Sequence, residues 1–226
     1  MNKLLFEGVL PIDNNISIES YCGIDLSGNN KDLDLFDTTS SSQWEEYVNA
    51  HLKENGAKVA FGGYLEVRNL YDRSEYFQAV DEASKRNIHL GIDFWCEAGT
   101  NVCAILDGKI HSFRDNTNYG DYGPTIILEH EDKGMTFYSL YGHLSFASLN
   151  GIAVGDAVRK GQPFAKLGDS SVNGDYAPHL HFQIIKDLQG NYGDYPGVCS
   201  ISTLSFFKEN CPNPMNFIKK KCLKLL

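Results

Sequence analysis

Two short motifs carry side chains that commonly bind metal ions. The first spans His89–Asp93 (HLGID) and the second spans Pro178–Phe182 (PHLHF). Zinc accepts imidazole nitrogens and carboxylate oxygens in a tetrahedral shell, and a catalytic zinc site has three protein ligands and leaves its fourth position to water. The histidine and aspartate of the first motif, with one histidine of the second, supply that number. Each motif alone is a weak signal, but together they indicate a site for one zinc ion (Zn²⁺) per chain.

The two histidines of the second motif, His179 and His181, are two residues apart. Residues at this spacing project from the same face of a β-strand, so both imidazoles can face one cavity. Leu180 and Phe182 then point to the other face, where apolar packing would fix the register of the strand. The alternative is a solvent-facing strand, which is the more frequent explanation of an arbitrary His-x-His.

A third element, Leu140–Ser145 (LYGHLS), favours the metal site. It places His143 at the end of another strand-like segment. In this order the three elements resemble the lysostaphin and LytM family of zinc endopeptidases, bacterial enzymes that cleave the peptide cross-bridges or stems of peptidoglycan. The resemblance covers about residues 88–186, and its combined motifs are highly specific.

The resemblance implies a role for each matching position. His89, Asp93 and His181 would bind the zinc ion, and His143 and His179 would be the catalytic pair beside it. Zinc lowers the pKa of a bound water toward neutrality and polarises the scissile carbonyl. A nearby imidazole can accept the proton of that water or, when protonated, stabilise the developing oxyanion. The sequence leaves open which histidine has which role.

Two further residues are candidates for contacts with the substrate. Arg68 precedes the first motif and shares one strand face with Glu66. An ion pair with Glu66 is the structural interpretation of Arg68, and a bidentate contact with a substrate carboxylate is the functional one. Tyr141, in the third element, is the second candidate.

These side chains need a scaffold of short strands. From His89 onward, apolar segments alternate with turns rich in glycine, asparagine and aspartate, which is typical of a compact antiparallel β fold. The dipeptide Asp107-Gly108 predicts a tight hairpin over Cys103–His111, because it supplies the positive φ angles of such a turn. Further strands are expected at 125–129, 136–140, 162–167 and 180–185.

The flanking regions add helices. A helix is expected from about Thr39 to Gly56, with a hydroxyl N-cap and apolar residues at helical spacing. Other expected elements are a strand at 58–67, a short helix at 76–85 and a terminal helix at 214–225.

The predicted fold class is therefore mainly β with some α. Its centre is a compact antiparallel β core of the lysostaphin/LytM type at residues 88–186. An α/β N-terminal extension, residues 1–87, would pack on this core, and residues 187–226 form a C-terminal extension with a short helix.

The other histidines and the cysteines do not lie in motifs that indicate a metal site. Surface or capping roles are expected for His51, His111 and His130. The six cysteines contain no C-x-x-C pair, which argues against a cysteine zinc site and predicts small buried side chains.

Composition narrows the partners. A net charge of -9, from 29 acidic and 20 basic side chains, disfavours nucleic acid and an anionic membrane as partners. A peptide or a peptidoglycan fragment is the expected substrate, and the oligomeric state is left open. The apolar stretch after Met1 is too short for a signal peptide. The chain is therefore expected in the cytoplasm if Met1 is the natural start, and in the periplasm or outside the cell if a signal peptide has been removed.

Two departures from the resemblance concern the substrate. The loop 168–178 before the His-x-His strand contains two acids and an aromatic residue instead of a short Gly/Ser-rich turn. A cell-wall substrate also requires export. Three hypotheses follow: a zinc peptidase acting on peptidoglycan or its fragments, a cytoplasmic zinc amidohydrolase acting on a small peptide-like metabolite, and a non-enzymatic regulatory domain of the same fold. All five expected positions are filled, which disfavours the third.

Overall fold

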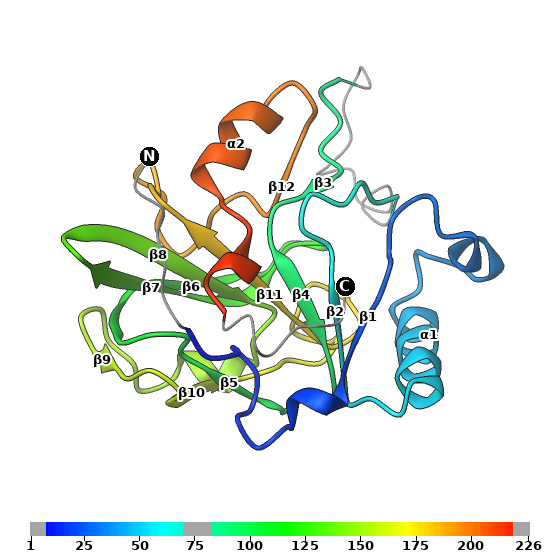
Figure 1. Ribbon diagram of the computed structural model, residues 1–226, viewed down its shortest axis with the longest axis horizontal. Coiled ribbons are helices and arrows are strands. Elements are labelled where there is room, and N and C mark those ends of the chain that lie inside the picture. Colours follow the sequence, from blue (N-terminus) through cyan, green and yellow to red (C-terminus); the bar gives the residue numbers. More distant parts are fainter. Residues whose placement is uncertain (1–7, 70–82, 219–226) are drawn as a thin grey trace.

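The computed structural model describes residues 8–69 and 83–218, and its largest element is an eight-stranded sheet (Figure 1). The strands lie in the order β1-β2-β4-β11-β8-β7-β6-β9. Neighbouring strands are antiparallel except β1 and β2, which run parallel. In that order, the strands span Tyr21–Gly23, Val59–Gly62, Ile92–Trp95, His179–Ile185, Met135–Gly142, Gly123–Asp132, Gly108–Asn116 and Ala157–Val158. The predicted antiparallel, mainly β fold is confirmed, and β1 and β2 extend its sheet.

Two short ladders and several helices surround this sheet. One ladder joins β5 (Asn101–Cys103) to β10 (Pro163–Lys166), and the other joins β3 (Ile88–His89) to β12 (Val198–Cys199). The α-helices are α1 (Ser41–Glu54), beside the β1–β2 edge, and α2 (Leu204–Asn210). Short 3₁₀ helices span Ile18–Ser20, Lys31–Leu35, Phe146–Leu149 and Pro214–Asn216.

Helix α1 forms where its sequence predicts. The side chain of Ser40 accepts a hydrogen bond from the backbone N–H of Gln43 at 3.4 Å, which satisfies one of the free donors of the first turn. Trp44, Val48 and Leu52 recur at helical spacing, and all three are buried against the sheet. Gly56 follows the helix with φ of +60°, a conformation that glycine adopts at little cost.

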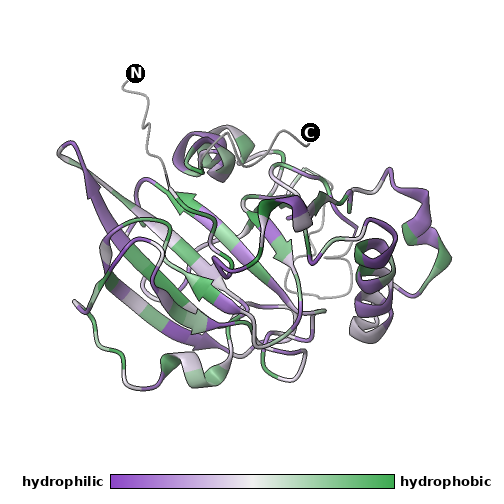
Figure 2. Cartoon of the chain, turned by 60° about the horizontal axis from the view of Figure 1, so that its bottom comes forward, coloured by the Kyte–Doolittle hydropathy of each residue, from purple (hydrophilic) through white to green (hydrophobic). Residues whose placement is uncertain are grey.

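The central sheet has a different role on each face. The side chains of Ile126, Tyr141 and Phe182 belong to the main hydrophobic core, which also contains residues from β5 and β10. The opposite face carries Leu140 and Ile185, which pack in a second cluster with residues near α2. Figure 2 shows hydrophobic (green) and hydrophilic (purple) residues interspersed along the strands. The polar candidate residues lie on the second face.

The structure corrects several predicted elements. Residues 103–111 do not form a hairpin, because β5 pairs with β10 whereas β6 pairs with β7 and β9. Glycine is needed at position 108 because there is no room for a side chain, and not because of a positive φ angle. A Cβ atom would lie 2.5 Å from the carbonyl oxygen of Glu129. The strand predicted at 58–67 ends at Gly62 and continues as a turn.

The remaining predictions have mixed outcomes. The four strands expected at 125–129, 136–140, 162–167 and 180–185 match β7, β8, β10 and β11. Helix α2 was not predicted, and the region around Pro214 is a single 3₁₀ turn as far as residue 218. The helix expected at 76–85 falls largely on residues 70–82, which lie outside the described residues, as does the end of the terminal helix.

Buried polar and sulfur-containing residues complete the interior. His130 is buried, with Nδ1 2.9 Å from the carbonyl oxygen of Asp107, so its predicted surface role is wrong. The five cysteines in the described ranges are free thiols, and all but Cys22 are buried, as expected. Among the described residues, no helix is long and apolar enough to cross a membrane.

Candidate metal centre and active site

Strand pairing brings the two sequence motifs together. In the antiparallel register of β4 and β11, His181 lies opposite Asp93 and His179 lies opposite Trp95. Residues two apart on each strand share a face, so these four side chains project to the same side of the sheet. His89 enters from β3, where it pairs with Val198. Gly91, between the two ligand positions of the first motif, has no room for a Cβ atom, which would lie 2.7 Å from the His181 ring.

Three potential ligand atoms converge in this arrangement. Nε2 of His89 lies 2.8 Å from Nδ1 of His181, and Oδ1 of Asp93 lies 3.2 Å and 3.3 Å from these nitrogens. Ligand atoms about 2.0–2.1 Å from the centre of a tetrahedron are about 3.3–3.4 Å apart. All three side chains are at least 97% buried. The two distances to Asp93 match this spacing and the distance between the two histidines is shorter, so the three atoms surround a space suited to one small cation.

The hydrogen bonds behind these rings determine which nitrogens carry protons. Nδ1 of His89 donates to the carbonyl oxygen of Gly63 at 2.9 Å. Nε2 of His181 donates to Oε1 of Gln183 at 3.0 Å, and the amide of Gln183 is itself oriented by donating to the carbonyl oxygen of Pro196. In the neutral rings, the two nitrogens that face each other therefore present lone pairs.

The aspartate adds a third acceptor to this cluster. Among the described residues, no N–H or O–H group donates to the buried Oδ1 of Asp93. Burial alone would raise the pKa of Asp93, but nearby His89 and Arg68 hold it well below its usual value. Burial lowers the pKa of His89 to about 4, so its ring is neutral at pH 7. The three buried atoms accept hydrogen bonds, and no hydrogen-bond donor in the described part of the chain lies between them. Two imidazole nitrogens and a carboxylate oxygen are ligands that Zn²⁺ prefers, so the predicted ligands fit that ion.

His143 and His179 lie beside this cluster with their ring centroids 4.1 Å apart. Nδ1 of His143 donates to the carbonyl oxygen of Asn173, and Nδ1 of His179 donates to that of Ala177, both at 2.8 Å. Each ring therefore keeps Nε2 as its free acceptor in the neutral form. Burial and the nearby His179 and His181 lower the pKa of His143 well below its usual value, and burial lowers that of His179 to about 4.

The backbone at His143 explains how it reaches the site. Strand β8 ends at Gly142, and His143 adopts a φ of +61°, an uncommon conformation for a residue with a side chain. Hydrogen bonds hold this conformation on both sides, from His143 N to Tyr122 O and from Gly168 N to His143 O. Local strain of this kind persists where surrounding structure imposes it, and it is frequent at functional sites.

A stack of aromatic rings supports the pair from below. The Trp95 ring lies 4.0 Å from the His179 ring at 18°, and Trp44 of α1 stacks on Trp95 with ring centroids 6.4 Å apart. The hydroxyl of Ser41, also in α1, donates to Asp175 in the loop 168–178. Helix α1 therefore contacts both β4 and the loop that carries the acceptors for His143 and His179.

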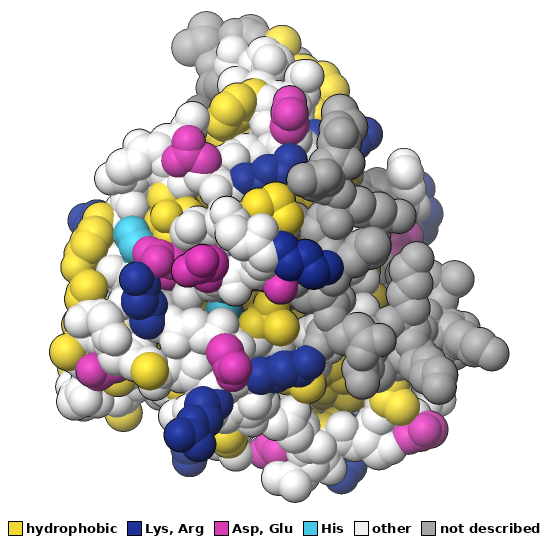
Figure 3. All heavy atoms as spheres, turned by 60° about the vertical axis from the view of Figure 1, so that its left-hand side comes forward, with side chains coloured by type: hydrophobic (Ala, Val, Ile, Leu, Met, Phe, Trp, Pro, Cys, Tyr) yellow, Lys and Arg dark blue, Asp and Glu magenta, His cyan; other side chains and the backbone are white. Residues whose placement is uncertain are grey.

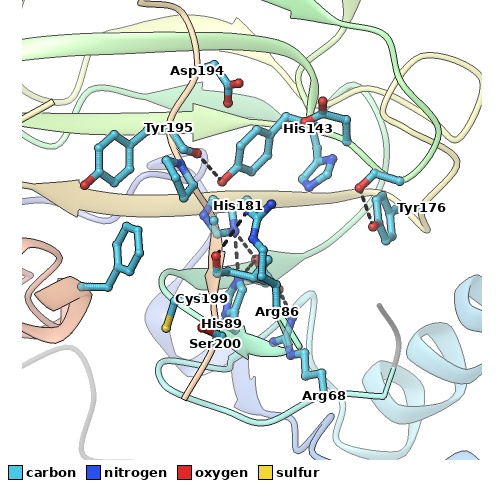
Figure 4. A pocket seen from close by; sticks show the side chains of 18 of the residues that line it. Arg68, Arg86, His89, His143, Tyr176, His181, Asp194, Tyr195, Cys199 and Ser200 are labelled. Atoms are coloured by element: carbon cyan, nitrogen blue, oxygen red, sulfur yellow. Dashed lines mark hydrogen bonds and ion pairs between the residues drawn. The ribbon is translucent and has the colours of Figure 1, made fainter. Parts of the chain in front are cut away.

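All five candidates line one cavity of about 530 Å³. In Figure 4, His89, His143 and His181 gather at the centre, with Asp194 on one side of His181 and Arg68 on the other. On the face that Figure 3 shows, acidic side chains (magenta) stand close to Lys or Arg side chains (dark blue), and a few histidine atoms (cyan) reach the surface. The walls also include Asp121 and Arg86. A polar ligand of peptide size fits such a cavity.

The two predicted substrate contacts, Tyr141 and Arg68, are both buried. Tyr141 is fully buried in the main core, packs against Phe164 and Phe182 and does not line the cavity, so the structure gives no support to its predicted contact with the substrate. An alternating strand would place it on the same face as His143, but the chain turns at His143. Arg68 is 2% exposed and forms ion pairs with Glu66 and Asp93, both at 2.6 Å. The ion pair with Glu66 that the sequence suggests is therefore present, and Arg68 also lines the cavity.

Sequence reasoning missed several residues that build the site. Gln183 and Trp95 lie two residues beyond predicted ligands on β11 and β4, so the spacing that relates His179 to His181 would have found both. The ring of Tyr122, 5.1 Å from that of His181, comes from the loop before β7 and carries no such signal. In the loop 168–178, Tyr176 lines the cavity, whereas its two acids do not.

Residues 87–194, which carry the three ligands and both auxiliary histidines, match the model of Peptidase family M23. This segment is an M23-family domain. Its boundaries exclude β1, α1 and β2 at one end and α2 at the other.

Named relatives share this domain. The chain is 33% identical over 131 residues to the glycyl-glycine endopeptidase ALE-1 of Staphylococcus capitis, covering 58% of this chain and 29% of that protein. It is 35% identical over 99 residues to the murein hydrolase activator EnvC of Escherichia coli (strain K12), covering 44% and 21%. The catalytic domain of lysostaphin from Staphylococcus simulans is 31% identical over 54% of this chain and 80% of that chain, with a TM-score of 0.36. The matched region is thus less than a third of the length of ALE-1 and EnvC.

Proposed function

We propose that this protein is a zinc-dependent metallopeptidase that hydrolyses peptide bonds. The observation that carries the proposal is the convergence of Nε2 of His89, Nδ1 of His181 and Oδ1 of Asp93 on one point, with no donor between them. When bound there, Zn²⁺ supplies a Lewis acid that polarises the scissile carbonyl and activates water for attack. The M23 domain supports the reaction class.

The chain's own residues then divide the remaining tasks. His143 and His179 each fix one ring nitrogen on a backbone carbonyl and present Nε2 to the cavity. A neutral imidazole in this orientation accepts a proton from the attacking water, and a protonated one donates to the oxyanion or to the leaving amine. Burial favours the neutral rings before substrate arrives, which suits the acceptor role. The rings of Tyr122 and Trp95 restrict water around the reacting bond.

The substrate class proposed first is a peptide from peptidoglycan. ALE-1 is named as a glycyl-glycine endopeptidase, and EnvC as a murein hydrolase activator. This chain keeps the filled ligand set that hydrolysis needs, which favours an enzyme over an activator. The cavity has room for a short peptide segment.

A second candidate is hydrolysis of a small peptide that carries free charges. Asp121 and Asp194 are both in the cavity wall, and burial together with the nearby Asp194 raises the pKa of Asp121. Arg86 lines the same cavity, with its guanidinium 3.4 Å from the carbonyl oxygen of Val198. A ligand with an ammonium group near the two acids and a carboxylate near Arg86 would match these charges.

Metal analysis tests the proposed function directly. We expect about one zinc per chain in the wild type and a large loss in His181→Ala, because only two ligands remain. His111→Ala serves as the control, since this ring packs against Tyr138 and Tyr192 outside the cavity. Equal zinc content in the wild type and His181→Ala would overturn the assignment.

A substrate panel separates the two candidates. Muropeptides and short free peptides are incubated with the zinc-loaded protein, and the products are identified by mass spectrometry. Cleavage of muropeptides supports the first candidate, and cleavage of short zwitterionic peptides alone supports the second. Cleavage of neither by the zinc-loaded wild type would contradict a peptidase.

A further inference from the structure

The segment Val59–Asn69 lies outside the matched region 87–194, yet it contacts two of the three metal ligands. It begins as β2, which pairs with β4 so that Gly62 lies opposite Asp93. It then turns across the site, where the backbone N–H of Leu65 donates to the carbonyl oxygen of His89. This placement puts the end of the segment directly behind the metal ligands.

Arg68 makes the first contact. Its Nη1 donates to Oδ2 of Asp93 at 2.6 Å, and its Nε donates to Oε2 of Glu66, also at 2.6 Å. Glu66 is anchored in turn, because its Oε1 accepts from the backbone N–H of Leu26 at 3.0 Å. The guanidinium is 98% buried, and charge-assisted hydrogen bonds of this kind are short, strong and directional.

The consequence falls on the orientation of Asp93. A carboxylate whose oxygens are both free can rotate about its terminal bond. Since Arg68 holds Oδ2, the other oxygen, Oδ1, faces His89 and His181. Groups that orient a metal ligand in this way commonly raise metal affinity by about 10- to 100-fold.

Gly63 makes the second contact and explains why the turn has its shape. Its carbonyl oxygen accepts from Nδ1 of His89, which leaves Nε2 for the metal. Its φ of +105° is a conformation that residues with side chains rarely adopt. A Cβ atom here would lie 2.0 Å from Nη2 of Arg68 and 3.0 Å from Nδ1 of His89. Only glycine allows the turn, the arginine and the histidine to occupy this space together.

We propose that Val59–Asn69 is an integral part of the metal centre and that Arg68 is a positioning residue which presents Oδ1 of Asp93 to the ion. This inference rests on the proposed function only in that a divalent metal binds at His89, Asp93 and His181. The matched region 87–194 by itself lacks Arg68, which orients Asp93, and the carbonyl of Gly63, which orients His89. Region 87–194 contains all three proposed ligands, but their orientation depends on residues 59–69.

Zinc affinity of the full chain tests the proposal without reference to any peptide substrate. Zinc is titrated against a chromophoric chelator for the wild type, Arg68→Met, Arg68→Lys and Glu66→Gln. We expect Arg68→Met to weaken zinc binding by about 10- to 100-fold. Arg68→Lys keeps the charge but loses the planar fork, so an intermediate loss is expected. Glu66→Gln keeps the volume but loosens the arginine, which predicts a smaller loss in the same direction.

The matched control is Arg159→Met, which removes an exposed arginine far from the cavity and should leave zinc affinity unchanged. Cobalt(II) substitution adds a spectroscopic readout, because its visible absorption reports the coordination geometry. We expect the Arg68 variants to alter this spectrum. A merely structural arginine would instead lower the melting temperature of the metal-free protein and leave both the zinc affinity and the cobalt spectrum as in the wild type.

Each outcome has a defined meaning. Unchanged zinc affinity in folded Arg68→Met or Arg68→Lys would overturn the positioning role. If both arginine variants fail to fold, Glu66→Gln decides, and wild-type affinity in that variant overturns the proposal. Failure of the wild type to bind zinc would instead overturn the proposed function, and zinc binding without peptide hydrolysis would leave the positioning role supported.

Discussion

Nε2 of His89 lies 2.8 Å from Nδ1 of His181, although the opposite nitrogen of each ring already donates a hydrogen bond. Two lone pairs at this distance repel each other unless a cation lies between them. Oδ1 of Asp93 adds a third acceptor at 3.2 Å and 3.3 Å. These contacts would therefore be electrostatically unfavourable without a cation, which supports the proposed metal site.

Removal of the metal should lower stability. Zinc at about 100 times its dissociation constant would stabilise the folded protein by about 2.7 kcal/mol, because it binds the folded chain in preference to the unfolded one. Thermal unfolding of the zinc-loaded and chelator-treated protein measures this difference, and His181→Ala should show none. Identical melting curves for the two wild-type samples would refute the expectation.

The auxiliary histidines should separate binding from catalysis. We expect His143→Ala to retain zinc and to lose about 10²- to 10⁴-fold in kcat, since the ring is expected to act in proton transfer and is not part of the cluster formed by His89, Asp93 and His181. Peptide hydrolysis and metal content are measured on the same preparations, with His111→Ala as the control. Loss of zinc in His143→Ala would show that this ring is a ligand.

Helix α1 should contribute to both stability and turnover. Trp44→Ala removes a ring that is 98% buried and that stacks on Trp95, so a loss of about 3–5 kcal/mol in unfolding free energy is expected. Because Trp95 stacks on His179, kcat of the remaining folded enzyme should also fall while zinc content stays the same. Urea unfolding and kinetics below the transition measure the two effects. Wild-type kcat in the folded variant would limit α1 to a packing role.

The acidic wall should select for amines. Asp194→Asn is expected to lower kcat/KM roughly tenfold for peptides with a free amino group, because a hydrogen bond to a charged group contributes about 1.5–3 kcal/mol. N-acetylated versions of the same peptides should be affected little. Glu209→Gln, at an exposed position of α2, is the control. Equal losses on free and acetylated peptides would show that Asp194 does not recognise the ammonium group.

Buried His130 should make stability depend on pH. Burial lowers its pKa in the folded protein, so below about pH 6.5 the unfolded chain binds a proton that the folded chain does not. Stability is therefore fully present above that pH and falls as the pH drops toward the folded pKa, by at most about 1.4 kcal/mol per pH unit. Urea unfolding between pH 7.5 and pH 5.5 should show a smaller change in His130→Gln than in the wild type. An equal change would exclude His130 as a source.

Local rules explain what could be predicted before the structure. The capping serine and apolar spacing of α1 act within a few residues, and the alternation along β11 fixes which histidines share a face. Two predictions based on the same local rules differ from the structure. Tyr141 and His143 are two apart, but the positive φ of His143 breaks the alternation. Asp107-Gly108 suits a hairpin, but the partner of β5 is β10, more than 50 residues away.

The amino-acid sequence by itself determined the chemistry of this protein: which five side chains gather, and that they suit a zinc ion. Those residues lie in short motifs whose types and spacing are legible without coordinates. Only the tertiary structure decided how the proposed ligands are oriented, because Arg68, Gly63 and Trp95 act through contacts with residues that are distant in the sequence. Hydrogen bonds and ring stacking depend on distances of a few ångströms, and these are set by the packing of the whole sheet.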